Sequence, residues 1–154
     1  MPPADMLIHA GDFSYFSRRR SQIRDFNEWL GELPHRFKIA VPGNHEYALE
    51  ADPRMRDAIS NAVLLIDERV EVEGLRIWGS PVTPLYGGAF GMSKSEDRKR
   101  HWAQVPEGTD ILITHAAPDG ILDHAPGTQV HAGCPFSGIS ATKFDRKLLN
   151  SSPP

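Results

Sequence analysis

Short apolar runs and one helical pattern alternate along the first 66 residues. Residues 6–10 are largely apolar and stop at Gly11 and Asp12, which is typical of a buried strand that ends in a turn. Apolar side chains then recur at spacings of three and four, at Ile23, Phe26, Leu30 and Leu33. This spacing predicts a helix with one apolar stripe, ending near Gly31 and Pro34. A second strand over 38–41 completes a strand–helix–strand order, which favours a parallel sheet.

Alternating and apolar segments predict further strands later in the chain. Residues 63–66 are apolar and predict a strand. Val70 and Val72 alternate with charged residues before Gly74, and the apolar run 75–78 follows. This arrangement predicts an antiparallel hairpin. Residues 110–114 predict one more buried strand.

Cap residues predict two additional helices. Asp52 followed by Pro53 is typical of a cap and first turn, and predicts a short helix that reaches Ile59. Ser93, with Glu96 three residues later, forms a capping-box pattern that predicts a helix through about residue 103. Between these helices, residues 79–91 contain two prolines and four glycines, which predicts an ordered surface loop.

Polar residues follow three of the predicted strands: Gly11-Asp12, the sequence Gly-Asn-His-Glu at 43–46, and Thr114-His115. Each pair alone also fits a turn or a hydrogen-bonded histidine. In open α/β sheets, however, the carboxyl ends of neighbouring strands share one rim where ligands bind. We therefore expect Asp12, Asn44 and His115 to converge on that rim. A carboxylate, an amide oxygen and an imidazole suit Mn, Fe, Zn or a similar divalent ion better than a thiolate-preferring metal.

Composition narrows the class of protein. The 154 residues are 40% apolar, which suits one packed domain. A net charge of −3 provides no basic excess for binding nucleic acid, and the basic cluster at 94–100 also contains acidic residues, as on a solvated helix face. The single cysteine, Cys134, fits a reducing compartment. With no leader-like terminus and no apolar span of 18 residues, we expect a cytoplasmic chain without membrane contact.

The three strand-end motifs, in this order and separated by helix-bearing stretches, resemble those of the calcineurin-like metallophosphoesterases. Flanking segments such as "FNEWLGELP", "RIWGSPVTP" and "DILITHAAP" further resemble the metallophosphoesterase-domain-containing branch, known for brain and fetal-tissue members. The resemblance runs from about Ala4 to Cys134. It implies a metallophosphoesterase-like domain over 1–134 and a divergent, poorly ordered tail over 135–154.

The resemblance also implies a role for each site residue. Asp12 matches an aspartate that bridges two metal ions, and Asn44 and His115 match ligands of the second ion. His45 matches a histidine beside the phosphate that acts as an acid or stabilises charge. Two ions about 3.5 to 4 Å apart can orient a phosphoester and activate water, and an imidazole can protonate the leaving oxygen. Glu46 is left outside the site because hydrogen bonding within the turn explains it equally well.

Two motifs usual in the family are absent from this sequence. No Asp-x-His motif precedes Gly11-Asp12, and no Gly-His-x-His motif follows His115. His124 and His131 lack the strand context to replace it. We therefore expect a chain truncated at both ends, a partial α/β/β/α sandwich with mixed sheets, and an incomplete two-metal site. A missing first strand would leave one position of a sheet unpaired.

The predicted function is metal-dependent hydrolysis of a phosphoester, with phosphodiesterase-like activity on a small phosphoester or cyclic nucleotide. Manganese is the expected ion, with iron, zinc and magnesium as alternatives. A second hypothesis is a catalytically impaired binding or regulatory module that retains a single metal or nucleotide site. A third is a fragment without function. Neither the specific substrate nor the oligomeric state follows from the sequence.

Overall fold

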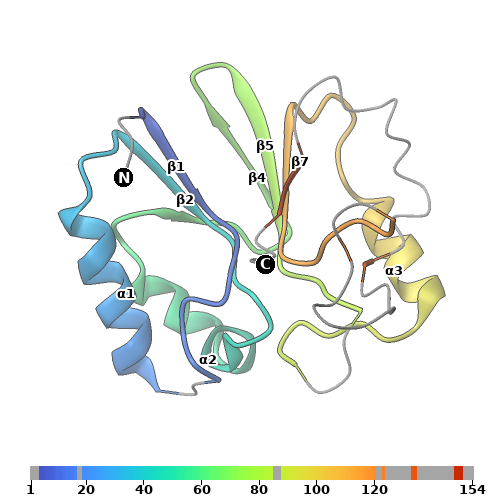
Figure 1. Ribbon diagram of the computed structural model, residues 1–154, viewed down its shortest axis with the longest axis horizontal. Helices are drawn as coiled ribbons and strands as arrows, with labels where there is room; N and C mark the ends of the chain where they lie inside the picture. The colour runs from blue at the N-terminus through green and yellow to red at the C-terminus, as the bar shows by residue number, and fades with distance from the viewer. Residues whose placement is uncertain are drawn as a thin grey trace.

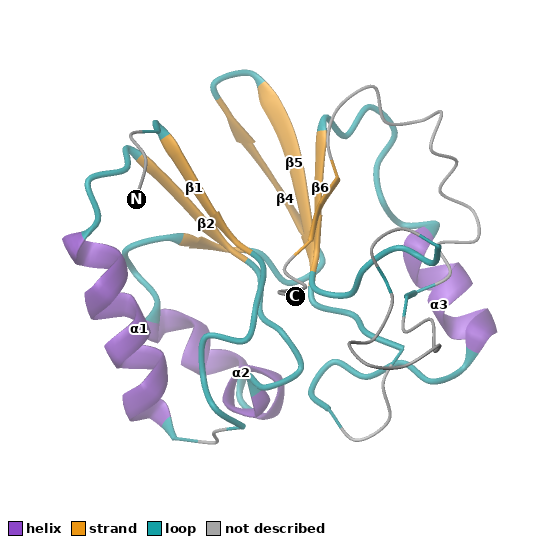
Figure 2. Ribbon diagram, in the orientation of Figure 1, coloured by secondary structure: helices purple, strands orange, loops and turns teal. Residues whose placement is uncertain are grey.

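The computed structural model describes residues 4–16, 19–84, 88–120, 123, 133–134 and 148–150. Two β-sheets face each other in the middle of the molecule (Figure 1). Helices α1 (Arg20–Glu32) and α2 (Tyr47–Ala51) lie outside one sheet, and α3 (Ser95–Trp102) lies beyond the other (Figure 2). The predicted α/β class and its α/β/β/α layers are confirmed.

The first sheet consists of three parallel strands: β1 (Met6–His9), β2 (Phe37–Ala40) and β3 (Val63–Leu64), in that order. Helix α1 connects β1 to β2, so the predicted strand–helix–strand unit and its parallel pairing are confirmed. Strand β3 is shorter than the predicted run over 63–66. The carboxyl ends of β1 and β2 therefore lie next to each other, and the loops that follow both strands meet.

Helix α1 forms because its apolar stripe has a core to cover. Ile23, Phe26 and Leu30 are all buried, as predicted, and pack in one cluster with Leu49 and Leu64. Fully burying each such side chain stabilises the fold by about 1.5 to 3 kcal/mol. The helix thereby covers the outer face of the first sheet.

The short helices partly follow the sequence signals. A 3₁₀ helix, η1 (Pro53–Ala58), replaces the predicted short helix, and Asp52 caps it by accepting a 3.0 Å hydrogen bond from the Arg54 amide. Helix α3 begins one residue later than the capping-box pattern suggests, with Lys94 rather than Ser93 at its N-cap and no side-chain cap, so that capping box is wrong. The buried Arg98 guanidinium instead binds the backbone carbonyls of Met92 and Ser93, at 2.7 and 2.6 Å, and fixes the entry to the helix.

The second sheet is mixed and contains β4 (Glu68–Val72), β5 (Leu75–Ser80), β6 (Ile111–Thr114) and β7 (Leu148–Asn150). Strands β4 and β5 form the predicted antiparallel hairpin, whereas β6 runs parallel to β5 and β7. Sequence patterns predicted neither β7 nor α2. Strand β7 lies within 135–154, so that segment supplies one strand to the sheet, while the domain boundary at 134 stays a prediction.

The two sheets pack through an apolar cluster that includes Ile39, Val41 and Leu65 from one side and Ile77 and Ile113 from the other. The closest approach is at Gly79 on β5. A Cβ atom added there would lie 2.5 Å from Leu65 Cβ and 2.7 Å from Val41 Cγ2. The absence of a side chain at Gly79 therefore lets the two sheets meet near the ends of β2 and β6.

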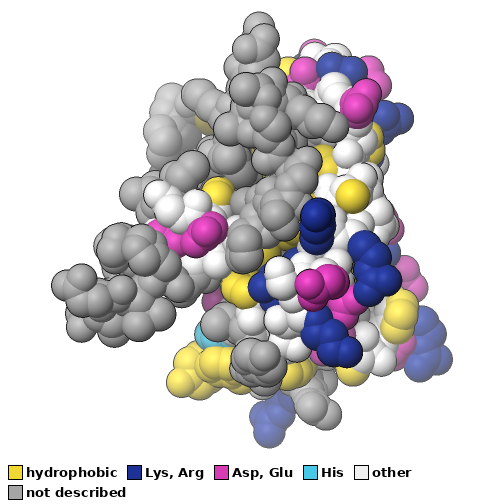
Figure 3. Space-filling view, turned by 90° about the vertical axis from the view of Figure 1, so that its right-hand side faces the viewer, with side chains coloured by type: hydrophobic (Ala, Val, Ile, Leu, Met, Phe, Trp, Pro, Cys, Tyr) yellow, Lys and Arg dark blue, Asp and Glu magenta, His cyan; other side chains and the backbone are white. Residues whose placement is uncertain are grey.

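The surface near α3 carries mixed charges. Figure 3 shows basic and acidic side chains interspersed on this face rather than gathered by sign. On α3 itself, Arg100 pairs with Asp97 one turn earlier. This agrees with the solvated helix face expected for the cluster at 94–100, except at Arg98, which is buried. Among the described residues, no helix has both the length and the apolar character needed to cross a bilayer.

Candidate metal centre

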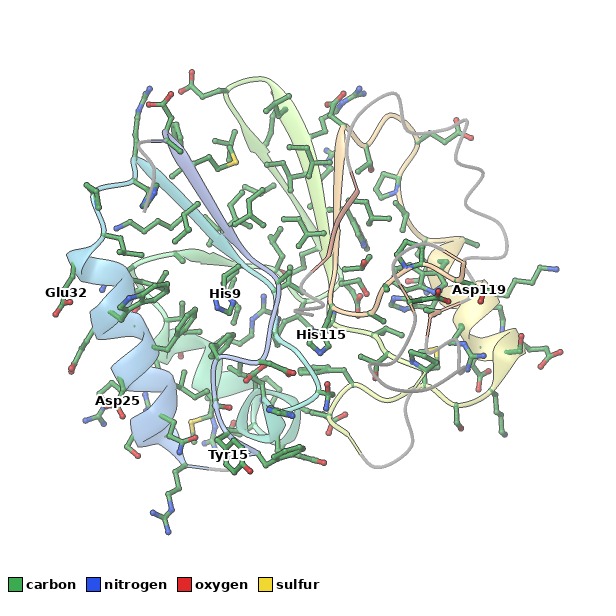
Figure 4. The ribbon with its side chains drawn as sticks, viewed as in Figure 1. His9, Tyr15, Asp25, Glu32, His115 and Asp119 are labelled. Atoms are coloured by element: carbon green, nitrogen blue, oxygen red, sulfur yellow. The ribbon has the colours of Figure 1, made fainter. Side chains whose placement is uncertain are left out.

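The three predicted ligands come from strands of two different sheets. Asp12 follows β1 and Asn44 follows β2, both in the first sheet, whereas His115 follows β6 in the second. The expectation of one shared rim on a single sheet is therefore wrong. The strand ends meet because the two sheets pack face to face. Figure 4 shows His115 between the sheets, at the end where their loops gather.

The side chains of these three residues nevertheless converge. His115 Nε2 lies 2.9 Å from Asn44 Oδ1 and 3.4 Å from Asp12 Oδ1. The other ring nitrogen, Nδ1, lies 2.8 Å from the Ala10 carbonyl oxygen. A carbonyl can only accept, so this contact places a proton on Nδ1. Histidines that bind metals are commonly oriented in this way, with the second nitrogen donating to a carbonyl.

This arrangement directs three acceptor atoms at one point. With the proton on Nδ1, the Nε2 lone pair of a neutral ring faces the oxygens of Asp12 and Asn44. Such a cluster is repulsive unless the Asn44 amide turns its N–H₂ group toward the ring, the ring takes up a second proton, or a cation lies between the three atoms. The donor set therefore fits a divalent ion held by Asp12 Oδ1, Asn44 Oδ1 and His115 Nε2. Three protein ligands with open positions are typical of catalytic metal sites.

Only two of these ligands are of the residue types that dominate metal sites. Within the described parts of the chain, no group of three or more His, Cys, Asp or Glu side chains could hold a metal ion. The proposed site therefore depends on the Asn44 amide, whose oxygen is the third ligand beside Asp12 and His115. His124 and His131, the two histidines weighed as replacement ligands, lie outside the described residues.

His45 lies beside the cluster without joining it. Its Nε2 atom is 3.8 Å from Asp12 Oδ2, and its backbone amide donates to Asp12 Oδ1 at 3.2 Å. The side chain is 22% exposed, compared with 10% for His115. An imidazole in this position can exchange protons with solvent and reach a group bound on the exposed side of Asp12.

Glu46 holds the two loops of the first sheet together. Its buried carboxylate accepts from the Asp12 and Gly43 amides through Oε2, at 2.9 and 2.5 Å. Through Oε1 it accepts from the amide and hydroxyl of Ser14, at 2.8 and 2.9 Å. Sequence reasoning assigned it only a turn hydrogen bond. Its spacing of three from Gly43 was the available signal, whereas its bonds to residues 12 and 14 required the fold.

The loop after β1 has an unusual backbone that brings Asp12 to the site. Gly11 has φ +108° and Asp12 has φ +59°, both in the left-handed region. A Cβ atom added to Gly11 would lie 2.5 Å from His115 Nδ1 and 2.7 Å from Gly43 Cα. Three loops therefore approach so closely here that only glycine fits at position 11. The bond from the Asp12 amide to Glu46 helps to hold this conformation.

His9 lies behind the site, next to aromatic side chains that pack in the core cluster beneath α1. Its ring contacts Phe13, Phe26 and Trp29 edge to face, and Nδ1 accepts from the Gly11 amide at 3.3 Å. Burial lowers the pKa of His9; nearby His115 lowers it further, while Asp12 opposes the shift. A neutral His9 is what the hydrogen bond from Gly11 requires, since the ring nitrogen must accept.

The predicted loop over 79–91 packs against the turn that carries Asn44. The Ala89 amide donates to the Asn44 carbonyl at 2.9 Å, and the Phe90 amide donates to Glu50 Oε1 at 2.7 Å. A Cβ atom added to Gly88 would lie 2.8 Å from Asn44 Cβ. Residues 85–87 lie outside the described part. The rest of the loop forms a wall that keeps Asn44 in place.

The chain belongs to the family described as calcineurin-like phosphoesterase, whose sequence profile matches residues 2–143. This agrees with the family inferred from the strand-end motifs. The class is therefore a metallophosphoesterase domain built on two facing sheets, with the site at the ends of β1, β2 and β6.

Among individual proteins, the chain is similar to the human and mouse proteins named metallophosphoesterase domain-containing protein 1. It is 36% identical to each over 159 residues, covering 87% of this chain and 48% of each relative. A UPF0046 protein from Caenorhabditis elegans is also 36% identical, over 80% of this chain and 47% of that protein. The chain thus spans about half the length of the curated relatives it matches.

Proposed function

We propose that this chain carries the metal-binding part of a metal-dependent phosphoester hydrolase with phosphodiesterase-like activity. The observation that supports the proposal most directly is the convergence of Asp12, Asn44 and His115 from two sheets, with acceptor atoms facing one point. Membership of the calcineurin-like phosphoesterase family agrees with it. The substrate we propose is a small phosphoester or a cyclic nucleotide.

The role that we propose for each residue is supported by its contacts. Asp12 and Asn44 would hold the ion through oxygen, and His115 through Nε2, while the Ala10 carbonyl keeps the His115 proton on Nδ1. A bound divalent ion would supply a more acidic water for attack on phosphorus. His45 would protonate the leaving oxygen, since its ring lies beside the exposed side of Asp12.

Manganese is the ion we propose, with iron, zinc and magnesium as alternatives, because mixed oxygen and imidazole donors suit all of them. We also propose that the protein acts in the cytoplasm. The support is Cys134, a buried free thiol, which agrees with a compartment where disulfides are not maintained.

A second candidate function is a binding or regulatory module that retains one metal ion. The specific observation behind it is that Asp12, Asn44 and His115 together provide donors for a single ion, whereas the two-metal reaction requires ligands for a pair. The two candidates differ in one measurable respect, because only the hydrolase turns over a phosphoester.

The test is hydrolysis of bis-para-nitrophenyl phosphate by the purified chain with added Mn²⁺. We expect metal-dependent release of nitrophenolate. With diphenyl phosphate, whose leaving oxygen is more basic and depends more on protonation, His45→Ala should lower kcat/KM by at least about 100-fold because a general acid is removed. Thermal unfolding measured with and without Mn²⁺ separates binding from catalysis. At a concentration about 100 times Kd, Mn²⁺ should stabilise the wild type by about 2.7 kcal/mol.

Asp12→Asn and His115→Ala should abolish this stabilisation, and His45→Ala should keep most of it. Asp52→Asn is the matched control, since Asp52 is a carboxylate that pairs with Arg54 rather than with the site residues. Stabilisation by Mn²⁺ without turnover would favour the binding module. Hydrolysis of diphenyl phosphate that is unaffected by His45→Ala would contradict the role of His45.

A further inference from the structure

Two large aromatic side chains in the loop after β1 are exposed to solvent. Tyr15 is 80% exposed and Phe16 is 51% exposed, whereas Phe26 and Trp102 are 8% and 1% exposed. Burial of aromatic surface is favourable, so a neighbouring pair left in water commonly marks a place where something binds. Figure 4 shows Tyr15 at the end of the molecule where the loops after β1 and β2 lie.

These rings stand next to His45. The Phe16 ring centroid lies 3.6 Å from that of His45, with the planes tilted by 37°. Tyr15 meets Phe16 edge to face at 5.5 Å and lies 6.2 Å from the His45 ring. Tyr47 adds a third ring 6.5 Å from Phe16. An exposed aromatic surface therefore adjoins the side chain that we propose protonates the leaving oxygen.

The loop holds this surface in an unfavourable backbone conformation. Phe16 has φ +44°, a left-handed value that aromatic residues rarely adopt. The residues just before Phe16 are anchored twice: Ser14 is bound to Glu46, and the Tyr15 amide donates to Gln22 Oε1 on α1 at 3.2 Å. Such strain persists only where surrounding contacts impose it, and it concentrates at functional sites.

We propose that Tyr15 and Phe16 form a stacking surface for a flat aromatic ring carried by the substrate. The substrate class is a phosphoester with an aryl or heteroaromatic group, in preference to one with only alkyl groups. This inference rests on the proposed function, because the phosphate would bind beside His45 and the metal ligands. Stacking on an aromatic side chain favours flat rings of many kinds, so the surface selects a shape rather than one compound.

The test uses two ligands that share an anionic head and differ only in the attached group. Phenylphosphonate and methylphosphonate contain a P–C bond and are therefore not cleaved as phosphoesters. Calorimetry with the Mn²⁺-loaded chain should show phenylphosphonate binding about 10-fold more tightly, as expected for one stacked ring. Tyr15→Leu and Phe16→Leu should reduce this preference to less than about 3-fold and leave methylphosphonate affinity unchanged.

Val63→Ala is the control, because Val63 is a 43% exposed apolar side chain on β3. It should keep the full preference for phenylphosphonate. Thermal unfolding of each variant checks folding. Since Tyr15 and Phe16 are each more than half exposed, leucine should be tolerated at both, and Tyr15→Leu carries the test if Phe16→Leu fails to fold.

Each outcome is decisive. Equal wild-type affinities for the two phosphonates, or a preference that survives both substitutions, would overturn the stacking surface and leave the hydrolase proposal standing. An equal loss for both ligands in Phe16→Leu would mean that Phe16 only supports His45, which also overturns it. If neither phosphonate binds, the phosphate site itself fails, and the proposed function fails with the inference.

Discussion

Glu46 shows how much of the site depends on a single side chain that lies outside the proposed set of metal ligands. It is fully buried, and its two oxygens accept four hydrogen bonds from Asp12, Ser14 and Gly43. Hydrogen bonds to charged groups are stronger than neutral ones, and buried donors that lose them are costly. The Glu46 carboxylate therefore holds the site residues in position and also stabilises the fold.

Glu46→Gln should lower the free energy of unfolding by about 2 to 3 kcal/mol, because the amide nitrogen of glutamine would face N–H donors that need an acceptor. Urea denaturation measures the change. Glu50→Gln is the matched control: Glu50 is exposed and accepts one bond from the Phe90 amide, which a glutamine oxygen can replace. It should cost less than about 0.5 kcal/mol. Equal losses for the two variants would show that Glu46 has no special role.

His9 should make stability depend on pH. Its pKa in the folded state is lowered by burial, so the unfolded chain takes up a proton near pH 6.5 while the folded chain resists it. The free energy of unfolding should therefore fall as the pH drops from about 7.5 to 5.5. His9→Asn, which keeps an acceptor for the Gly11 amide, should flatten this decline.

The measurement is urea denaturation in the presence of a metal chelator, at several pH values. Above about pH 7.5, His9 is neutral in both states, so wild type and His9→Asn should then change with pH in parallel. A variant that follows the wild-type decline throughout the acidic range would show that His9 is not the group responsible.

At the scale of elements, the sequence predicted a helix or strand correctly where its apolar pattern matched the face that packs against the core. The 3.6-residue period of α1, the alternation in β4 and the apolar run in β5 were sufficient, because each element has one face against a core. Helix α2 has only five residues and too little length for a periodic signal. Strand β7 is three residues long and is defined by pairing with β6, which no local pattern records.

Gly43 lies where the loops after β1, β2 and β6 approach one another closely. A Cβ atom added to Gly43 would lie 2.6 Å from the Asp12 amide and 2.6 Å from His115 Cε1. Gly43→Ala should therefore push the loops after β1 and β6 away, cost about 1 to 3 kcal/mol, and weaken Mn²⁺ binding by at least about 10-fold. Chemical denaturation and metal titration measure the two effects.

Gly74, in the hairpin between β4 and β5, provides the contrast. It has φ +76°, and an added Cβ atom would meet nothing within 4 Å. Gly74→Ala should cost about 1 kcal/mol from backbone strain alone, with Mn²⁺ affinity unchanged. If both alanine variants weakened metal binding equally, general destabilisation would explain the loss, and the close approach at Gly43 would not.

At the scale of the whole molecule, the site exists because two sheets pack closely. Gly79 on β5 lies against Leu65 and Val41, and β6 beside it leads to His115. Gly79→Ala should cost about 1 to 3 kcal/mol by overpacking. Because it separates the sheets, it should also weaken Mn²⁺ binding by moving His115 away from Asp12 and Asn44.

A double-mutant cycle checks this explanation. Leu65→Gly alone removes a buried side chain, including the Cβ atom that lies 2.5 Å from a Cβ added at Gly79, and should cost at least about 2 kcal/mol. Combined with Gly79→Ala, it makes room for the added methyl group. The loss of free energy of unfolding in the double variant should therefore be smaller than the sum of the two single losses by at least about 0.5 kcal/mol. Strict additivity of the two losses would mean that the side chains at positions 65 and 79 do not interact.

The sequence by itself determined the local features of this protein: buried strands that end in polar residues, an amphipathic first helix, a hairpin and the motifs of a phosphoesterase family. Tertiary structure alone decided that Asp12 and Asn44 belong to one sheet and His115 to the other, and that Glu46 ties two loops together. The physical reason is distance along the chain. Asn44 and His115 touch across 71 residues, and such contacts depend on sheet packing rather than on local periodicity.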